Sequence, residues 1–191
     1  MSRHAPLIAA AAVFVVAAAF VLLFVVPRWY APKAAGTTAS TTGTPAAPER
    51  KITATLYFVA EDGLSLVGVK REVPFGDPVV EQARRLVEAQ LGAAPAPLLA
   101  SAPAGTTLRA LFLTERGDAF VDLSAEVTTR HTGGSLNELF TVYAIVDALT
   151  VNLPAITRVQ ILVEGKEVDT IAGHVDVRHP LQKNLKWVTD H

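Results

Sequence analysis

The chain has 191 residues and no cysteine, and its 17 Lys and Arg nearly balance its 18 Asp and Glu, giving a net charge of −1. The missing cysteines exclude disulfide scaffolds, thiol catalysis and a lipidated cysteine anchor. The balanced charge argues against a nucleic-acid partner, because such proteins normally carry a clear basic excess. The apolar residues, half of the total, are unevenly distributed, with a dense run near the N-terminus.

Residues 7–26 are twenty consecutive apolar residues, followed at once by Trp29 and Tyr30. A helix of this length covers ~30 Å, the thickness of the bilayer hydrocarbon core, and aromatic rings favour the headgroup zone that follows. A buried core helix so apolar all round needs a larger protein, and a cleavable signal peptide normally has a shorter apolar region. Residues 1–30 are therefore predicted to be a single-pass transmembrane anchor, with its helix at about 7–26.

Residues 31–50 follow as a linker made almost entirely of Ala, Thr, Pro, Gly and Ser. This composition buries too little apolar surface to offset its conformational entropy, so it predicts a disordered tether with a reach of ~25 Å. Arg3 and His4 flank one side of the anchor, and Arg28 and Lys33 flank the other. The flanking charges therefore leave the orientation of the anchor open.

From residue 51 onward the pattern indicates a folded domain. Period-2 alternation and helical spacing predict six strands and two helices in the order β-β-α-β-β-α-β-β, over residues 52–59, 64–73, 79–91, 108–114, 119–123, 135–149, 157–163 and 167–171. Ser135 and Glu138 have the spacing of a capping box at the start of the second helix. Tyr57 falls on the outward face of the first strand. The expected fold class is α+β, with one mostly antiparallel sheet and both helices on one face.

Several of these segments together resemble the GerMN domain, a sporulation and spore germination module of bacterial envelope proteins. The resemblance runs over most of residues 52–180 and rests on six pieces in order: Leu56-Tyr57-Phe58, Leu91-Gly92, Ser101-Ala102-Pro103-Ala104-Gly105-Thr106, Val121-Asp122-Leu123-Ser124, Gly134-Ser135 with Leu149-Thr150, and Val159-x-Ile161. Ala148 departs from the family pattern, and only one copy fits the chain. The resemblance implies a GerMN-like domain at residues 51–180, outside the cytoplasmic membrane, with a polar tail at 181–191.

Asp122, Ser124 and His131 are close in sequence and contain the residue types of a hydrolytic triad. The chain lacks the Gly-x-Ser-x-Gly turn that activates such a serine, and triad chemistry depends on spatial geometry. A carboxylate and a hydroxyl at a strand end more often accept hydrogen bonds from nearby backbone N–H groups. The sequence therefore predicts no enzyme activity, no catalytic residue and no cofactor.

His174, Asp176 and His179 form a second polar cluster. Residues two positions apart on a strand share a face. His174 and Asp176 are therefore weak candidates for metal ligands, with His179 as a third. Pro180 suggests that the strand has ended by then, which favours a solvated loop. The prediction is no metal.

Tyr57, Asp122 and Ser124 remain as candidate binding residues. We expect a non-enzymatic, membrane-anchored binding or assembly module on the extracytoplasmic side of the cell membrane. Its expected contacts are the cytoplasmic membrane through residues 7–26 and an envelope protein or peptidoglycan, with no nucleic acid. The alternative is a hydrolase acting on peptidoglycan, or a glycan-binding accessory.

Overall fold

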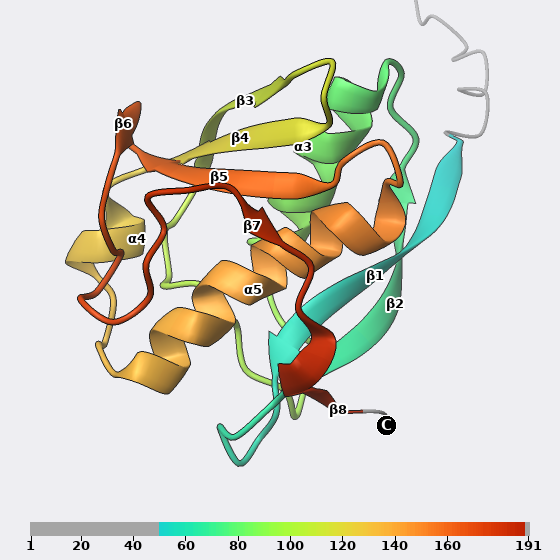
Figure 1. Cartoon of the computed structure of the whole chain (residues 1–191). Helices are drawn as coiled ribbons and strands as arrows, with labels where there is room; N and C mark the ends of the chain where they lie inside the picture. Colours follow the sequence, from blue (N-terminus) through green and yellow to red (C-terminus); the bar gives the residue numbers. More distant parts are fainter. Residues whose placement is uncertain (1–49, 190–191) are drawn as a thin grey trace, which may run out of the picture. The chain divides into compact units, whose positions relative to one another are not determined.

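The computed structural model describes residues 50–189 (Figure 1), so the predicted anchor over residues 7–26 and nearly all of the linker lie outside the described residues. Within residues 50–189 no helix is both long and apolar enough to cross a membrane. The elements are β1 Lys51–Val59, β2 Leu66–Pro74, α3 Val79–Gln90, β3 Leu108–Leu113, β4 Asp118–Leu123, α4 Glu126–Thr129, α5 Ser135–Asn152, β5 Arg158–Val163, β6 Lys166–Glu167, β7 Leu181–Gln182, the 3-10 helix η2 Leu185–Trp187, and β8 Val188–Thr189.

The predicted α+β class is confirmed, and most strand pairings are antiparallel as predicted, but the single sheet is wrong. The strands form two mixed sheets, one ordered β1-β2-β8 and one ordered β3-β4-β5-β6 with β7 also paired to β5. Strands β4 and β5 are parallel, as are β2 and β8. The chain crosses from β4 to β5 through α5, and a helical crossover of this kind returns the chain in the same direction. A third helix, the short α4, precedes α5.

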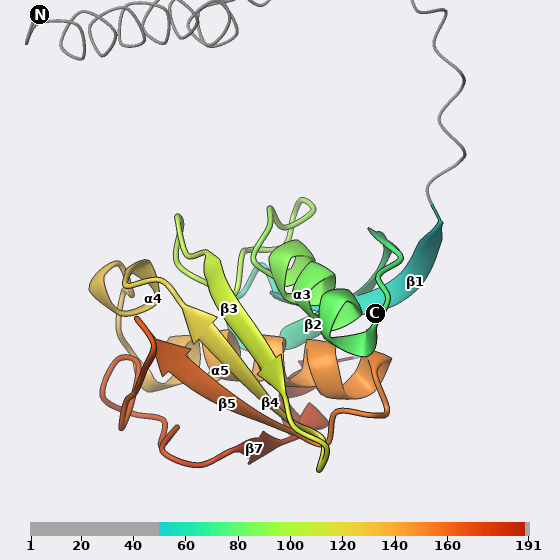
Figure 2. The same ribbon diagram turned by 90° about the horizontal axis from the view of Figure 1, so that it is seen from above.

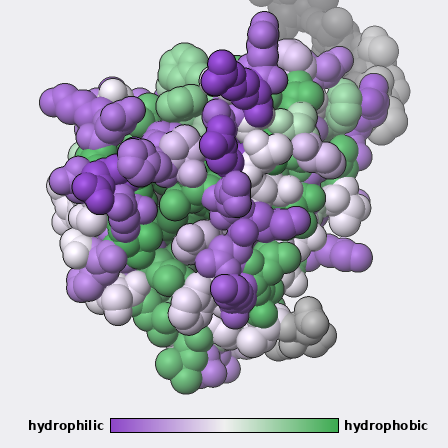
Figure 3. Space-filling model, in the orientation of Figure 1, coloured by the Kyte–Doolittle hydropathy of each residue, from purple (hydrophilic) through white to green (hydrophobic). Residues whose placement is uncertain are grey.

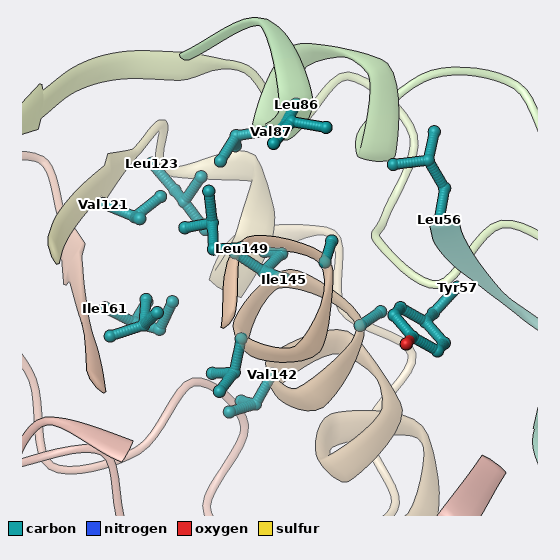
Figure 4. Close-up of a cluster of buried hydrophobic side chains, with 14 of the residues drawn as sticks. Leu56, Tyr57, Leu86, Val87, Val121, Leu123, Val142, Ile145, Leu149 and Ile161 are labelled. Atoms are coloured by element: carbon teal, nitrogen blue, oxygen red, sulfur yellow. The ribbon is translucent and has the colours of Figure 1, made fainter. Parts of the chain in front are cut away.

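Helix α5 lies between the two sheets. It contacts β1 on one side and β5 on the other, with α3 packed beside it (Figures 2 and 4). Nearly every side chain from Phe140 to Leu149 is buried, which is the pattern of a helix covered on all sides rather than on one face. Apolar side chains of α3, β4 and β5 complete the core around it, among them Leu86, Leu123 and Ile161.

The free edge of β1 is closed by two side-chain amides. The Asn152 amide accepts from Thr55 N at 2.8 Å and donates to Thr55 O at 2.7 Å. The Gln90 amide does the same for Tyr57, at 2.8 Å and 2.6 Å. Val59 continues the row by exchanging two backbone hydrogen bonds with Leu99. A side-chain amide presents an N–H and a C=O at peptide-like spacing, so these side chains replace a neighbouring strand.

The C-terminal segment, residues 168–189, has little regular structure and is fastened by three side chains from the core. Glu138 accepts from the backbone N–H groups of residues 171, 172 and 174, at 2.7–2.8 Å. Gln160 donates to Val177 O, and Asp147 accepts from Asn184 N at 2.8 Å. The predicted strand over 167–171 is reduced to β6, because these side chains satisfy the backbone in place of a ladder.

The predicted capping box at the start of α5 is also wrong. The N-cap is Gly134, and no side chain caps the helix. Glu138 is fully buried and its carboxylate is used on the C-terminal segment. The long-range contact therefore replaces the local one that the spacing suggested.

Candidate functional site

A pocket of about 230 Å³ lies where three separate parts of the chain meet. Its lining comes from the end of β1 and the turn that follows, from residues 99–103, and from residues 130–132 together with the first turns of α5. Hydrophobic surface reaches the lower end of the face in Figure 3, where the turn between β1 and β2 lies. The Val59–Leu99 backbone pair fixes one wall of the pocket, and α5 fixes the other.

The polar wall of the pocket is a chain of hydrogen bonds. Gly133 N donates to His131 Nδ1 at 3.0 Å, and His131 Nε2 lies 3.2 Å from Thr141 Oγ1. The Thr141 hydroxyl donates to Ser101 O at 2.6 Å. Since Nδ1 accepts a hydrogen bond, the neutral ring carries its proton on Nε2, and Nε2–H donates a hydrogen bond to Thr141 Oγ1. Both ring nitrogens are therefore used within the protein.

Burial lowers the pKa of His131, with the nearby His174 adding to the effect and Glu138 opposing it. Burial alone would raise the pKa of Glu138, but the backbone N–H groups of Ala172, His174 and Ile171 together hold it below its ordinary value. At neutral pH the pocket wall thus contains a neutral imidazole, backed by a buried carboxylate.

Arg130 is the only permanent cation among the residues that line the pocket, and no lining residue is acidic. Its Nη1 donates to Ala104 O at 3.3 Å. A side chain on Gly105 would meet Nη1 at 2.9 Å, and Gly105 has a φ of +87°, so glycine permits both the turn and the close approach. Asn137 donates to Gly133 O, which leaves its Oδ1 as an acceptor at the pocket.

Tyr57 is buried, which corrects the expectation of an outward aromatic. Its side chain is 3% exposed and packs against α5 (Figure 4). Burial, assisted by the charge of Asp147, raises the pKa of Tyr57 to about 12. The alternation along β1 predicts one buried face, but α5 covers the second face too, the one that carries Tyr57. Tyr57 does not line the pocket.

Asp122 and Ser124 bind the backbone at the end of β4. Asp122 Oδ1 accepts from Gly165 N at 2.7 Å, and its Oδ2 pairs with Arg109 at 3.0 Å. Ser124 Oγ accepts from Thr107 N at 3.0 Å. His131 uses its ring on Gly133 and Thr141, so the three triad-type residues have separate partners.

His174, Asp176 and His179 also do not form a ligand set in the part of the chain that the structure describes, where no group of three or more His, Cys, Asp or Glu is placed to hold a metal. His174 lies against Glu138, with Nδ1 3.2 Å from Oε2. Asp176 is held by Arg178, whose hydrogen bonds lower the pKa of that carboxyl.

Sequence reasoning missed Arg130 and Asn137 as pocket residues. Neither belongs to a motif, and both reach the pocket only because α4 and α5 fold back on the 99–103 loop. One signal was available. The Ser101–Thr106 piece of the GerMN resemblance is this loop, and its first three residues line the pocket.

A family model described as Germane, sporulation and spore germination, matches residues 55–169. Among solved structures, the tandem GerMN domains of the sporulation protein GerM from Bacillus subtilis align with 70% of this chain at 20% identity and a TM-score of 0.59, and the chain spans 46% of that structure. The first GerMN domain of the same protein aligns at 20% identity and a TM-score of 0.55, over 69% of this chain and 97% of that one. A putative lipoprotein from Clostridium perfringens aligns at 22% identity and a TM-score of 0.51, over 72% and 92%. No curated protein matches the chain.

Proposed function

The chain belongs to the Germane family of sporulation and spore germination domains, and from this premise we propose that it is a binding or assembly module, anchored in the cell membrane and facing the outside of the cytoplasm. Its task is to hold a partner within a bacterial envelope process. Catalysis is not part of this proposal.

The location is supported by the sequence. The twenty apolar residues at 7–26 have the length of a membrane span, and the linker that follows gives the domain reach away from the surface. The solved relatives include a sporulation protein and a putative lipoprotein. An anchored domain outside the cytoplasmic membrane fits both observations.

The pocket between Val59, the 99–103 loop and α5 is the observation that carries the binding role. It combines an apolar wall with one cation and a fixed network of hydrogen bonds, the mixture typical of small recognition sites. His131 and Thr141 bond each other, and each also bonds the backbone, through His131 Nδ1 and Thr141 Oγ1, so the wall is fixed before any partner arrives.

The polar groups that would serve a hydrolase are used elsewhere. Ser124 Oγ accepts from a backbone N–H, Asp122 is paired with Arg109, and His131 contacts neither. A nucleophile needs an adjacent base that is itself oriented by a third group. These contacts favour a binding module over the peptidoglycan hydrolase.

The chain has no cysteine, so a single introduced thiol can report on which side of the membrane it lies. A full-length chain with Glu61→Cys carries one thiol in the exposed turn after β1, and Ser2→Cys carries one before the apolar run. We expect a membrane-impermeant maleimide to label Glu61→Cys in intact cells and Ser2→Cys only after lysis. The opposite pattern, or labelling of both only after lysis, would contradict the proposed location.

Binding is tested by chemical crosslinking of the full chain in its native bacterium, followed by mass spectrometry. We expect adducts with envelope proteins or peptidoglycan peptides. Recovery of the chain without any envelope adduct would reject the assembly role.

A further inference from the structure

The size and charge of the pocket limit what it can hold. Its volume of about 230 Å³ lies below the range of a typical drug-sized site, which favours a small group such as a chain end. With Arg130 and no acidic residue in the lining, it favours an anionic group over a cationic one.

Arg130 has hydrogen-bonding capacity to spare. Its guanidinium has five N–H donors, of which Nη1 serves Ala104 O. Glu126, on the preceding turn, interacts electrostatically with Arg130 but does not line the pocket. The remaining donors match the paired oxygens of a carboxylate.

The backbone of Ala100 offers a second anchor. Leu99 exchanges both of its backbone hydrogen bonds with Val59, so the amide and carbonyl of the next residue face away from β1. Within residues 50–189 neither backbone group of Ala100 has a hydrogen-bond partner, and Ala100 is exposed and lines the pocket. An extended peptide can pair with these two groups as a strand does.

The apolar part of the lining favours a small aliphatic side chain. Val59, Ala102 and Pro103 contribute to it, together with Leu99, which is 51% exposed at the rim. Short aliphatic groups bury their surface against such a lining without needing polar partners.

We propose that the pocket binds the free carboxyl terminus of an extended peptide ending in small aliphatic residues such as alanine. Arg130 pairs with the carboxylate, Ala100 pairs with the peptide backbone, and the apolar part of the lining receives the methyl groups. This ligand class rests on the proposed binding function and gives it a chemical target. Both a protein C-terminus of L-alanine and an envelope peptide ending in D-alanine present this chemistry.

Fluorescence anisotropy of the full chain in mild detergent tests the proposal with fluorescein-labelled Gly-Gly-Ala-Ala. Three probes are compared, namely the L-Ala-L-Ala carboxylate, the D-Ala-D-Ala carboxylate and the L-Ala-L-Ala carboxamide. We expect one carboxylate probe to bind at least tenfold more tightly than the carboxamide, because the lost charge leaves Arg130 without its partner. The enantiomer that binds identifies the source of the peptide.

Two variants of Arg130 test whether the carboxylate binds at this residue. Arg130→Gln should weaken the preferred carboxylate at least tenfold, and Arg130→Lys, which keeps the charge but not the forked geometry, should weaken it less. Arg116→Gln, in the exposed turn between β3 and β4, is the matched control and should leave affinity unchanged. Equal binding of carboxylate and carboxamide by the unaltered chain would overturn the proposal, and this comparison needs no variant to fold.

The outcomes also separate this inference from the proposed function. If no peptide binds while envelope adducts still form in the native bacterium, the ligand class is wrong and the assembly role stands. If the adducts are missing as well, both are rejected.

Discussion

The edge of β1 and the C-terminal segment are both held by side chains from the core, but by different chemistry. Neutral amides of Gln90 and Asn152 close the edge of β1, each donating one bond and accepting another. The C-terminal segment depends mainly on two buried carboxylates, Glu138 and Asp147. Each neutral amide is satisfied by one peptide group of β1 and one further acceptor, Ser101 Oγ for Gln90 and Ala148 O for Asn152, whereas a buried carboxylate needs several donors to offset its loss of water.

The two carboxylates differ in how well that need is met. Glu138 accepts three backbone N–H groups, and its pKa lies below its ordinary value. Asp147 has one such partner for Oδ1 and none for the buried Oδ2. Its burial raises the pKa to about 6, against the opposing effects of Asn184 N and Lys183. The number of donors, rather than depth alone, decides whether a buried carboxylate supports the fold.

The largest effect is expected from Glu138→Ala. This change removes the acceptor of the N–H groups of residues 171, 172 and 174, at about 1–3 kcal/mol for the buried Ile171 and less for each of the other two, which lie closer to solvent. We expect a loss of about 4 kcal/mol and a fall in melting temperature of about 10 °C, measured by thermal unfolding. Glu61→Ala, in an exposed turn, should change stability by less than about 0.5 kcal/mol. A loss as small as that of the control would refute the role given to Glu138.

Gln90→Met tests the neutral amides that close the edge of β1. The side chain keeps its length, but the backbone N–H and C=O of Tyr57 lose their partners in a buried place. We expect a loss of about 3 kcal/mol in denaturant unfolding, equal at pH 5 and pH 8 because no titrating group is removed. A loss that changes between these two pH values would contradict the distinction between amides and carboxylates.

Asp147→Asn tests the carboxylate that has too few donors. Because the folded-state pKa is raised from 3.8 to about 6, the contribution of this carboxyl to stability is complete below pH 3.8 and is lost as the pH rises through about 6. The neutral amide avoids that loss. We expect the variant to be about 2 kcal/mol more stable than the unaltered chain at pH 8, with the difference vanishing near pH 4. The stability difference between the variant and the unaltered chain should therefore grow from pH 4 to pH 8 in favour of the variant. A difference that instead shifts in favour of the unaltered chain would contradict the prediction.

The smallest effects are expected at the end of β4, where Asp122 and Ser124 bind backbone N–H groups closer to solvent. Asp122→Ala removes the acceptor for Gly165 N, and Ser124→Ala removes that for Thr107 N. Each should lower stability by about 1 kcal/mol, and binding should weaken only as far as the fold does. A Ser124→Ala chain of full stability that no longer binds its envelope partner would show that the hydroxyl belongs to a site.

The regular elements were largely predictable because their signals are local. Apolar periodicity located β1, β2, α3 and α5 within a few residues, and Gly and Pro marked the loops between them. The burial of Tyr57 was not predictable, because alternation indicates one buried face and carries no information about a second layer. The parallel pairing of β4 and β5 was missed for a similar reason, since it depends on how α5 crosses the sheet.

The candidate pocket was much less predictable. Glu138 fits a capping box by spacing, yet its partners are residues 171–174, more than thirty positions away. Arg130 and Asn137 have no local pattern that distinguishes them from surface residues. Two signals were present: the Ser101–Thr106 loop, through its resemblance to the GerMN pattern, and His131, which drew attention as a triad-type residue and lines the pocket without its expected partners.

The binding role of the pocket is the central claim, and site-specific photo-crosslinking tests it most directly. A photoreactive phenylalanine replaces Leu99 at the pocket rim or, as the matched control, Phe112 on β3, where the two side chains are 51% and 61% exposed. We expect the full chain in its native bacterium to yield envelope adducts from position 99 and none from position 112. Adducts from position 112 alone would place binding on the β3 side of the domain and contradict the account.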